Sequence, residues 1–227
     1  MILQNFERYI KDDTLRQLLG PEFKMSVNFI MNESSLNNFC GKYYSDNIPR
    51  VVICADSPRP HQPGKTGIPF IDTQLVPLDV PMESYSVDKR LEEFYLEVLK
   101  QFGMDSFFRK FYVTNISSLS FSRGSDRKSI KFDKLPSPIV EIIKRNFLLE
   151  MAIIQPTHVI CLGSNVQNTV RKLLHASVDC SIRLPHPSWI LAAYCRDEQD
   201  QYINRYLETL SRNFQKADSS SKCNHLC

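Results

Sequence analysis

Short runs of apolar residues that end abruptly in polar ones recur along this chain. In the first run, Val51, Val52 and Ile53 are contiguous β-branched residues, and the run stops at Asp56. Contiguous apolar residues over such a length are typical of a strand that is buried on both faces of a sheet. The pattern predicts four strands, at residues 50–56, 110–115, 157–162 and 181–184.

Segments with the spacing of amphipathic helices separate these strands. The clearest starts at Leu91, carries apolar residues at i, i+3, i+4, i+7, i+8 and i+11, and is closed by Gly103. This spacing places one apolar stripe along a helix. Similar patterns predict helices around residues 139–147, 165–174 and 203–214, and we also expect helix in the N-terminal region.

Strands that alternate with helices indicate a parallel sheet covered by helices on both faces. We therefore expect the α/β class, with three α/β/α layers around a central, mainly parallel sheet of four strands. In such sheets, ligands bind where the carboxyl ends of the strands open. The residues at those ends are Asp56, Asn115, Gly163 and His186.

Length and composition favour one domain. The chain has 227 residues, of which 42% are hydrophobic, and this is enough for one sizeable core. We expect a single domain over residues 1–215 and a disordered polar tail over residues 216–227. Neither a signal peptide nor an apolar segment long enough to span a bilayer is evident, so we expect an intracellular protein with no membrane partner.

The seven cysteines are scattered and odd in number, which fits neither a small disulfide framework nor paired zinc spacing. We expect Cys54 and Cys161 to be buried thiols, and the pattern implies no metal or other cofactor.

The net charge of +3 and the pI near 8.4 permit a polyanionic partner without identifying one. Positive charge concentrates in a polar loop that we expect at residues 117–134, and such a loop suits either phosphate binding or plain solvation. Its basic residues are Arg123, Arg127, Lys128, Lys131 and Lys134.

Two motifs invite specific chemistry. Pro63-Gly64-Lys65-Thr66 is similar to part of a phosphate-binding loop, but Arg59 stands where that motif needs glycine, and Gly67 and Pro69 disfavour the helix that should follow. Nucleotide hydrolysis is therefore disfavoured. Asp56 by itself fits a turn cap, and His186 by itself fits a hydrogen-bonded loop histidine.

A family resemblance changes this balance. Thr66-Gly67-Ile68-Pro69-Phe70 and His186-Pro187-Ser188 resemble motifs of the uracil-DNA glycosylase superfamily, in particular the bacterial branch of its single-strand-selective monofunctional (SMUG-like) class. The likeness extends from about residue 40 to residue 210 and implies the fold of that superfamily.

The resemblance implies roles for individual residues. Phe70 matches the aromatic residue that stacks on the extruded base, Asn115 the residue that reads the uracil edge, and His186 the residue that stabilises charge on uracil O2. Core packing of Phe70 and a strand-end cap at Asn115 are the alternatives. We expect further substrate contacts at Pro58, Pro187 and Ser188, and DNA contacts at Arg59, Lys65, Arg123, Arg127, Lys128 and Trp189. Trp189, Ile190 and Leu191 are candidates for the wedge that fills the gap left by a flipped base.

The first motif departs from this class. Ser57 stands where the class carries an asparagine that positions the attacking water, and serine lacks the carbonyl that could do so. Asp56 instead falls where a branch with Gly-Glu-Ala-Pro keeps its catalytic carboxylate, so we assign the catalytic roles to Asp56, Ser57 and His186. Arg59 is a second departure, since relatives have glycine or tyrosine there.

Two hypotheses follow. In the first, the protein is a monomeric DNA repair glycosylase that hydrolyses the N-glycosidic bond of uracil, or of a modified uracil, after base flipping. It would act in the nucleus of a eukaryote or in the cytoplasm otherwise. In the alternative, it is a catalytically impaired protein of the same fold that binds DNA or another protein.

Overall fold

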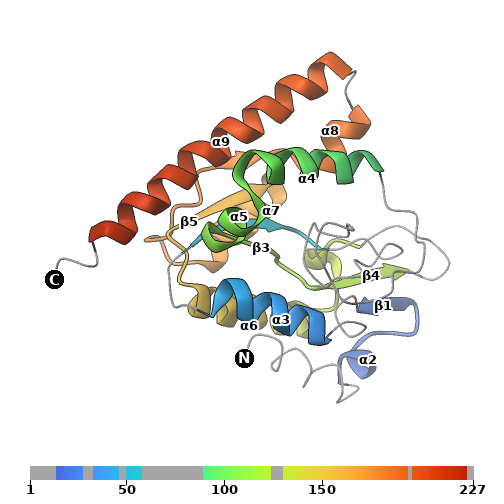
Figure 1. The fold of residues 1–227 in the computed structure, drawn as a ribbon. Helices are drawn as coiled ribbons and strands as arrows, with labels where there is room; N and C mark the ends of the chain where they lie inside the picture. The colour runs from blue at the N-terminus through green and yellow to red at the C-terminus, as the bar shows by residue number, and fades with distance from the viewer. Residues whose placement is uncertain are drawn as a thin grey trace.

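The centre of the molecule is a parallel sheet of four strands in the order β3-β2-β5-β6. The computed structural model describes residues 14–27, 33–45, 50–57, 89–123, 130–193 and 196–223. The strands are β2 (Val51–Ala55), β3 (Phe111–Asn115), β5 (His158–Leu162) and β6 (Arg183–Leu184). The predicted class, strand number and direction are confirmed (Figure 1).

Helices cover both faces of this sheet. In Figure 1, α4 (Lys89–Phe102), α8 (Pro187–Ala193) and α9 (Arg196–Cys223) lie above it, and α3 (Glu33–Tyr44) and α6 (Ser137–Ile154) lie below. The remaining described helices are α2 (Thr14–Leu18), α5 (Met104–Lys110), the 3₁₀ turn η2 (Phe132–Lys134) and α7 (Ser164–Leu173). The molecule therefore has the three layers that the alternating pattern predicts.

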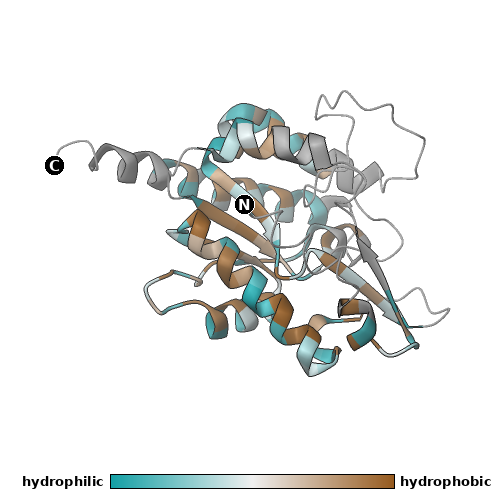
Figure 2. Cartoon of the chain, turned by 90° about the horizontal axis from the view of Figure 1, so that it is seen from below, coloured by the Kyte–Doolittle hydropathy of each residue, from teal (hydrophilic) through white to brown (hydrophobic). Residues whose placement is uncertain are grey.

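The core is continuous through the layers. The five residues of β2 are 0–5% exposed, because β2 is paired on both edges and covered on both faces. Figure 2 shows hydrophobic residues along the strands and on the faces of the helices that turn toward them. Cys54 and Cys161 are buried free thiols, as expected. Among the helices of the described residues, none is long and apolar enough to cross a membrane.

A second, two-stranded sheet was not anticipated. β1 (Phe23–Val27) pairs antiparallel with β4 (Leu119–Arg123), so the N-terminal region is not wholly helical and residues 117–134 are not one loop. The serines of β4 were the source of this error, since Ser120 and Ser122 are as buried as the apolar residues between them. A strand whose polar residues are also buried does not alternate between core and solvent, and its sequence therefore resembles a loop.

The C-terminal helix is also longer than expected. α9 continues to Cys223, into the segment that the polar composition indicates as a disordered tail. The helix contains neither proline nor glycine, so nothing in its sequence interrupts the backbone hydrogen bonds.

One acidic side chain is buried between the sheet and α6. Glu150 accepts hydrogen bonds from the hydroxyls of Tyr112 (2.7 Å) and Thr114 (2.6 Å). Burial raises the pKa of Glu150 from 4.5 to about 7, because removal from water disfavours the ionised form. A raised carboxyl pKa contributes stability that is complete below pH 4.5 and is lost as the pH rises through 7.

We therefore predict that Glu150→Gln stabilises the protein at pH 8 relative to wild type. The amide keeps the acceptor oxygen and cannot ionise, and a rise from 4.5 to about 7 corresponds to roughly 3 kcal/mol. Urea unfolding at pH 5 and pH 8 measures the gain, which should shrink at pH 5. Glu141→Gln, an exposed position on the same helix, is the matched control. A gain that is equal at both pH values would contradict this account.

Candidate active site

Three polar residues lie at the carboxyl edge of the central sheet. Asp56 follows β2, Asn115 is the last residue of β3, and His186 comes two residues after β6. Ala55 and Asn115 are direct partners in the sheet, so Asp56 and Asn115 occupy neighbouring strand ends. β5 lies between β2 and β6, which places the ends of β2 and β6 about 10 Å apart at the usual strand spacing.

Backbone hydrogen bonds hold the ends of β2 and β3 together. Ile116 N donates to the carbonyl of Ala55 (2.8 Å), and Ser117 N donates to the carbonyl of Asp56 (3.0 Å). The pairing thus continues one residue beyond β2 and two residues beyond β3. The backbone of Asp56 is therefore held by the sheet itself.

Asp56 is a half-buried carboxyl whose electrostatic surroundings disfavour ionisation. Burial is the main cause that raises the pKa of Asp56, the nearby Asp133 raises it further, and Lys131 opposes the rise. Within the described chain, the carboxylate has no ion pair or hydrogen bond. An unpaired carboxyl with a raised pKa can accept a proton more readily than an ordinary aspartate.

Asn115 is a buried polar residue whose side chain is available for hydrogen bonding. The residue is 8% exposed, and among the described residues nothing forms a hydrogen bond with its carboxamide. The strand-end cap considered from the sequence is therefore not seen in that part of the chain. The preceding residue, Thr114, is fixed by its hydrogen bond to Glu150 on the α6 side of the sheet. The Asn115 carboxamide therefore has donor and acceptor atoms left for a ligand.

His186 stands immediately before α8. Its carbonyl accepts hydrogen bonds from Trp189 N (2.9 Å) and Ile190 N (3.3 Å), and the buried Pro187 is the first residue of the helix. Proline is common at this position because its fixed φ suits a helix and its missing N–H is not needed there. The backbone of His186 is therefore fixed from both sides, by β6 and by α8.

The three wedge candidates differ in how much of each side chain is exposed in α8. Trp189 is 51% exposed, whereas Ile190 is fully buried and Leu191 is 9% exposed. Burial disfavours Ile190 and Leu191 as wedge residues, because the helical turn directs them away from solvent. Trp189 is the candidate that reaches the surface, and its ring is 6.4 Å from that of Tyr202.

The described part of the chain includes some of the other expected site residues. Pro58, Arg59, Lys65, Phe70, Arg127 and Lys128 lie outside the described residues, and so does the side chain of Ser188 in α8. Ser57 is half-buried beside Asp56. Arg123 is at the exposed end of β4, with its guanidinium 5.4 Å from the centre of the Phe23 ring.

Sequence reasoning missed the neighbours of Asp56. Lys131 and Asp133 flank the buried Phe132 in and before η2, and both act electrostatically on Asp56. A single 3₁₀ turn has no periodic signal, so the sequence alone had no means to bring these residues to the end of β2. Within the described ranges, no group of three or more His, Cys, Asp or Glu residues could hold a metal ion.

Comparisons with known proteins show the family and the fold. The model of the uracil DNA glycosylase superfamily matches residues 42–211. The crystal structure of wild-type SMUG2 from Pedobacter heparinus, one of 28 matching chains, is similar with a TM-score of 0.65 and 22% identity, over 93% of this chain and 97% of that one. At this identity, the likeness concerns the fold. A search of curated proteins found no match.

The position of Asp56 should reduce the stability of the fold near neutral pH. Because the folded-state pKa is raised, stability is complete below the ordinary aspartate pKa and is lost as the pH rises through the raised value. We predict that Asp56→Asn has a higher melting temperature than wild type at pH 8, with a smaller difference near pH 4. Asp105→Asn is the matched control, because the pKa of Asp105 is lowered by its hydrogen bonds to Tyr43 and Lys42. That variant should instead lose stability at pH 8. A melting temperature for Asp56→Asn at or below that of wild type at pH 8 would contradict the assignment.

Proposed function

This chain belongs to the uracil DNA glycosylase superfamily, and we propose that it hydrolyses the N-glycosidic bond of uracil, or of a modified uracil, in DNA. One observation carries the proposal. Asp56 and Asn115 lie on neighbouring strand ends, and their side chains have no hydrogen-bond partner among the described residues. His186 follows β6, which is two positions from β2 in the same sheet. Asp56, Asn115 and His186, to which the resemblance gives roles, thus all follow or end strands of the same sheet.

Asn115 is the proposed reader of the base. Uracil presents an N–H donor at N3 and a carbonyl acceptor at O4, and a carboxamide offers the complementary acceptor and donor. Because Asn115 is buried, a base that fails to match would leave its polar atoms unpaired, which costs about 1–3 kcal/mol for each group. Phe70, outside the described residues, is proposed to stack on the ring.

His186 and Asp56 are proposed to act at two different points of the reaction. When the bond between C1′ and N1 breaks, the electron pair leaves with the uracil ring, and negative charge collects on O2. An N–H of His186 that points to O2 would lower the barrier, and one such donor is worth about 3–4 kcal/mol. A water molecule then adds its oxygen to C1′ and gives a proton to the Asp56 carboxylate, a step worth roughly a hundredfold to ten-thousandfold.

DNA is the proposed partner because the target bond is hidden inside a duplex. The base must be extruded at a cost of a few kcal/mol, or it must come from a single strand, where the cost is lower. Trp189 is exposed next to His186 and is proposed to fill the gap. We propose that this chain acts as a member of the SMUG-like class, because its residues 66–70 and 186–188 are similar to motifs of that class.

We predict that the wild-type protein releases free uracil from a single-stranded oligonucleotide. His186→Ala should lower kcat by about a hundredfold to a thousandfold, and Asp56→Ala by a similar or larger factor. His175→Ala, an exposed histidine after α7, should have no effect. Chromatography of the released base measures each rate. If the wild type releases no more uracil than the His186→Ala, Asp56→Ala double variant, the chain does not catalyse this reaction.

Ser57 favours one competing function, a DNA-binding module without catalysis, since it cannot position water as asparagine would. That function predicts equal affinity for uracil-containing and uracil-free strands, together with no release.

The pH profile tests the role of Asp56 as a base. Because its pKa is raised by burial and by Asp133, kcat/KM should fall on the acid side at a pH above the ordinary aspartate value. Asp133→Asn removes one cause of the rise and should move this acid limb to lower pH. Glu141→Gln removes a carboxylate from α6 that is not among the causes for Asp56 and should leave the limb in place. An acid limb that Asp133→Asn leaves unchanged would rule out Asp56 as the titrating base.

A further inference from the structure

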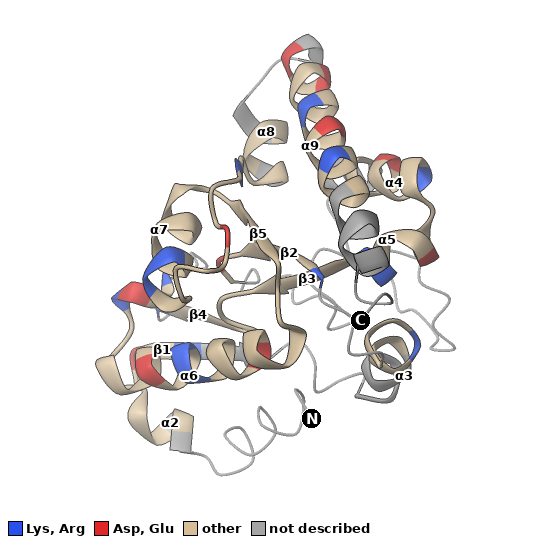
Figure 3. Ribbon diagram, turned by 90° about the vertical axis from the view of Figure 1, so that its left-hand side faces the viewer, with Lys and Arg blue, Asp and Glu red and all other residues tan. Residues whose placement is uncertain are grey.

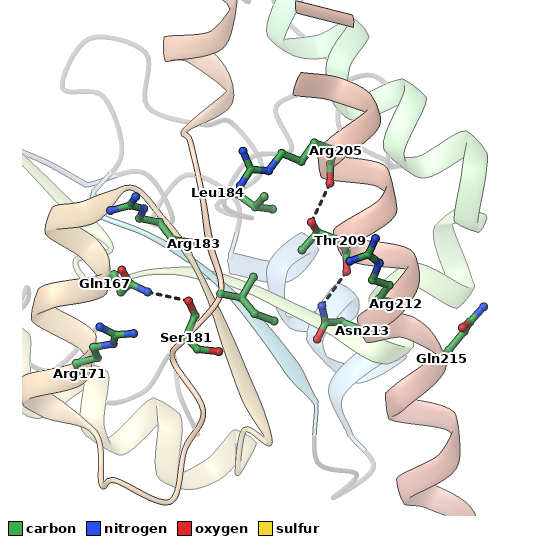
Figure 4. Close-up of a pocket in the computed structure, with 11 residues that line it drawn as sticks. Gln167, Arg171, Ser181, Arg183, Leu184, Arg205, Thr209, Arg212, Asn213 and Gln215 are labelled. Atoms are coloured by element: carbon green, nitrogen blue, oxygen red, sulfur yellow. Dashed lines mark hydrogen bonds between the residues drawn. The ribbon is translucent and has the colours of Figure 1, made fainter. Parts of the chain in front are cut away.

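A polar groove of about 970 Å³ lies along the free edge of the sheet, outside the candidate active site. Its floor is the chain before and within β6, and its walls are α7 and α9 (Figure 4). The lining residues are Gln167, Arg171, Ser181, Ile182, Arg183, Leu184, Arg205, Thr209, Arg212, Asn213 and Gln215. Its volume is at the upper end of the range for small-ligand pockets, so it has room for a short stretch of an extended chain.

Four arginines surround this groove. In Figure 4, Arg171 and Arg183 lie on the α7 side of the strand, and Arg205 and Arg212 extend from α9 on the other side. All four are exposed, and Figure 3 shows lysine and arginine on both helices. The described lining includes no carboxylate.

Three of these cations are uncompensated. Arg212 is 3.6 Å from Glu208, but in the described part of the chain Arg171, Arg183 and Arg205 have no carboxylate within ion-pair distance. Like charges that face one groove repel one another, and a polyanion in the groove would relieve that repulsion. Guanidinium groups also match the geometry of phosphate oxygens.

A buried amide oxygen indicates more than a bare anion. Asn213 is 3% exposed, and its Nδ2 donates to the carbonyl of Thr209 (2.8 Å). Its Oδ1 is buried in the groove wall and has no hydrogen-bond partner among the described residues. A phosphate oxygen cannot satisfy Oδ1, since both are acceptors. An amino group of a nucleobase can, although the side chains over Oδ1 must shift to admit it, because the atom is covered in the free protein.

The groove and the candidate active site share one strand. β6 ends at Leu184 in the groove, and His186 follows two residues later. Arg205 and Arg212 are seven residues apart on α9, which is two helical turns or about 10 Å. They can therefore contact different phosphates of one strand that continues from the site.

We propose that this groove binds the single-stranded segment of DNA that flanks the flipped nucleotide, an inference that rests on the proposed function. The arginines contact its phosphates, and Asn213 Oδ1 accepts a hydrogen bond from a base amino group. A charged groove that follows a strand without reading its sequence is a common mode of single-strand binding.

A binding experiment tests this proposal. Fluorescence anisotropy measures the affinity for a labelled, uracil-free single strand of about 16 nucleotides over a range of salt concentrations. Loss of two phosphate contacts lowers the salt slope by about 1.4, which is about a 25-fold weaker affinity at roughly 0.1 M salt. We expect this change for Arg205→Gln, Arg212→Gln and a similar one for Arg171→Gln, Arg183→Gln. The control, Lys100→Gln, Arg145→Gln, removes two exposed cations outside the groove and should bind as wild type does.

Several outcomes would overturn the proposal. One is that folded groove variants, checked by circular dichroism, keep the wild-type slope; another is that they lose no more affinity than the control. In a competition experiment, polyglutamate is added at equal charge concentration. If it displaces the strand, and if the variants weaken the affinity for both ligands equally, that result would assign the groove to an acidic protein segment instead. Because the probe has no uracil, arginine-dependent binding without uracil release would overturn the proposed function and leave the groove assignment intact.

Discussion

The pairing of β2 between two parallel neighbours sets the positions of the other central strands and of the candidate site. It fixes Val51 opposite Phe111 and His158 at one end and Ala55 opposite Asn115 at the other. The start of the strand is fixed by the buried Arg50, whose guanidinium donates to the carbonyls of Tyr43 (2.6 Å) and Arg109 (3.1 Å). A shift of one residue would turn every side chain of the strand to the opposite face and move Asp56 away from Asn115.

This arrangement places polar groups against a dry core. Burial raises the pKa of Asp56 at the strand end and that of Glu150 beneath β3. The two carboxyls differ in their partners, since Glu150 is hydrogen-bonded by Tyr112 and Thr114, whereas Asp56 has no such bond in the described chain. A carboxyl that is held without partners suits proton transfer better than structural support.

Much of the fold could be predicted from the sequence because its central strands are short runs of contiguous apolar residues. Those runs located β2, β3 and β5 to within a residue or two, and the topology of parallel sheets then brought Asp56, Asn115 and His186 to one edge. β1 and β4 could not be predicted, since burial of Ser120 and Ser122 depends on what packs on both faces. The influence of Asp133 on the pKa of Asp56 could not be predicted either, because it depends on the path of a chain segment far away in the sequence. The arginine groove was missed for the same reason, because its four cations come from α7, β6 and α9 and meet only in the folded chain.

Asp56, Asn115 and His186 are proposed to surround one base. The decisive measurement is a crystal structure of the Asp56→Asn variant with a uracil-containing single strand, since that variant should bind the substrate and cleave it far more slowly than wild type. We expect a uracil ring hydrogen-bonded through N3 and O4 to the Asn115 carboxamide, with O2 within hydrogen-bond distance of the His186 imidazole. A base bound elsewhere, or an Asn115 side chain occupied by the protein itself, would contradict it.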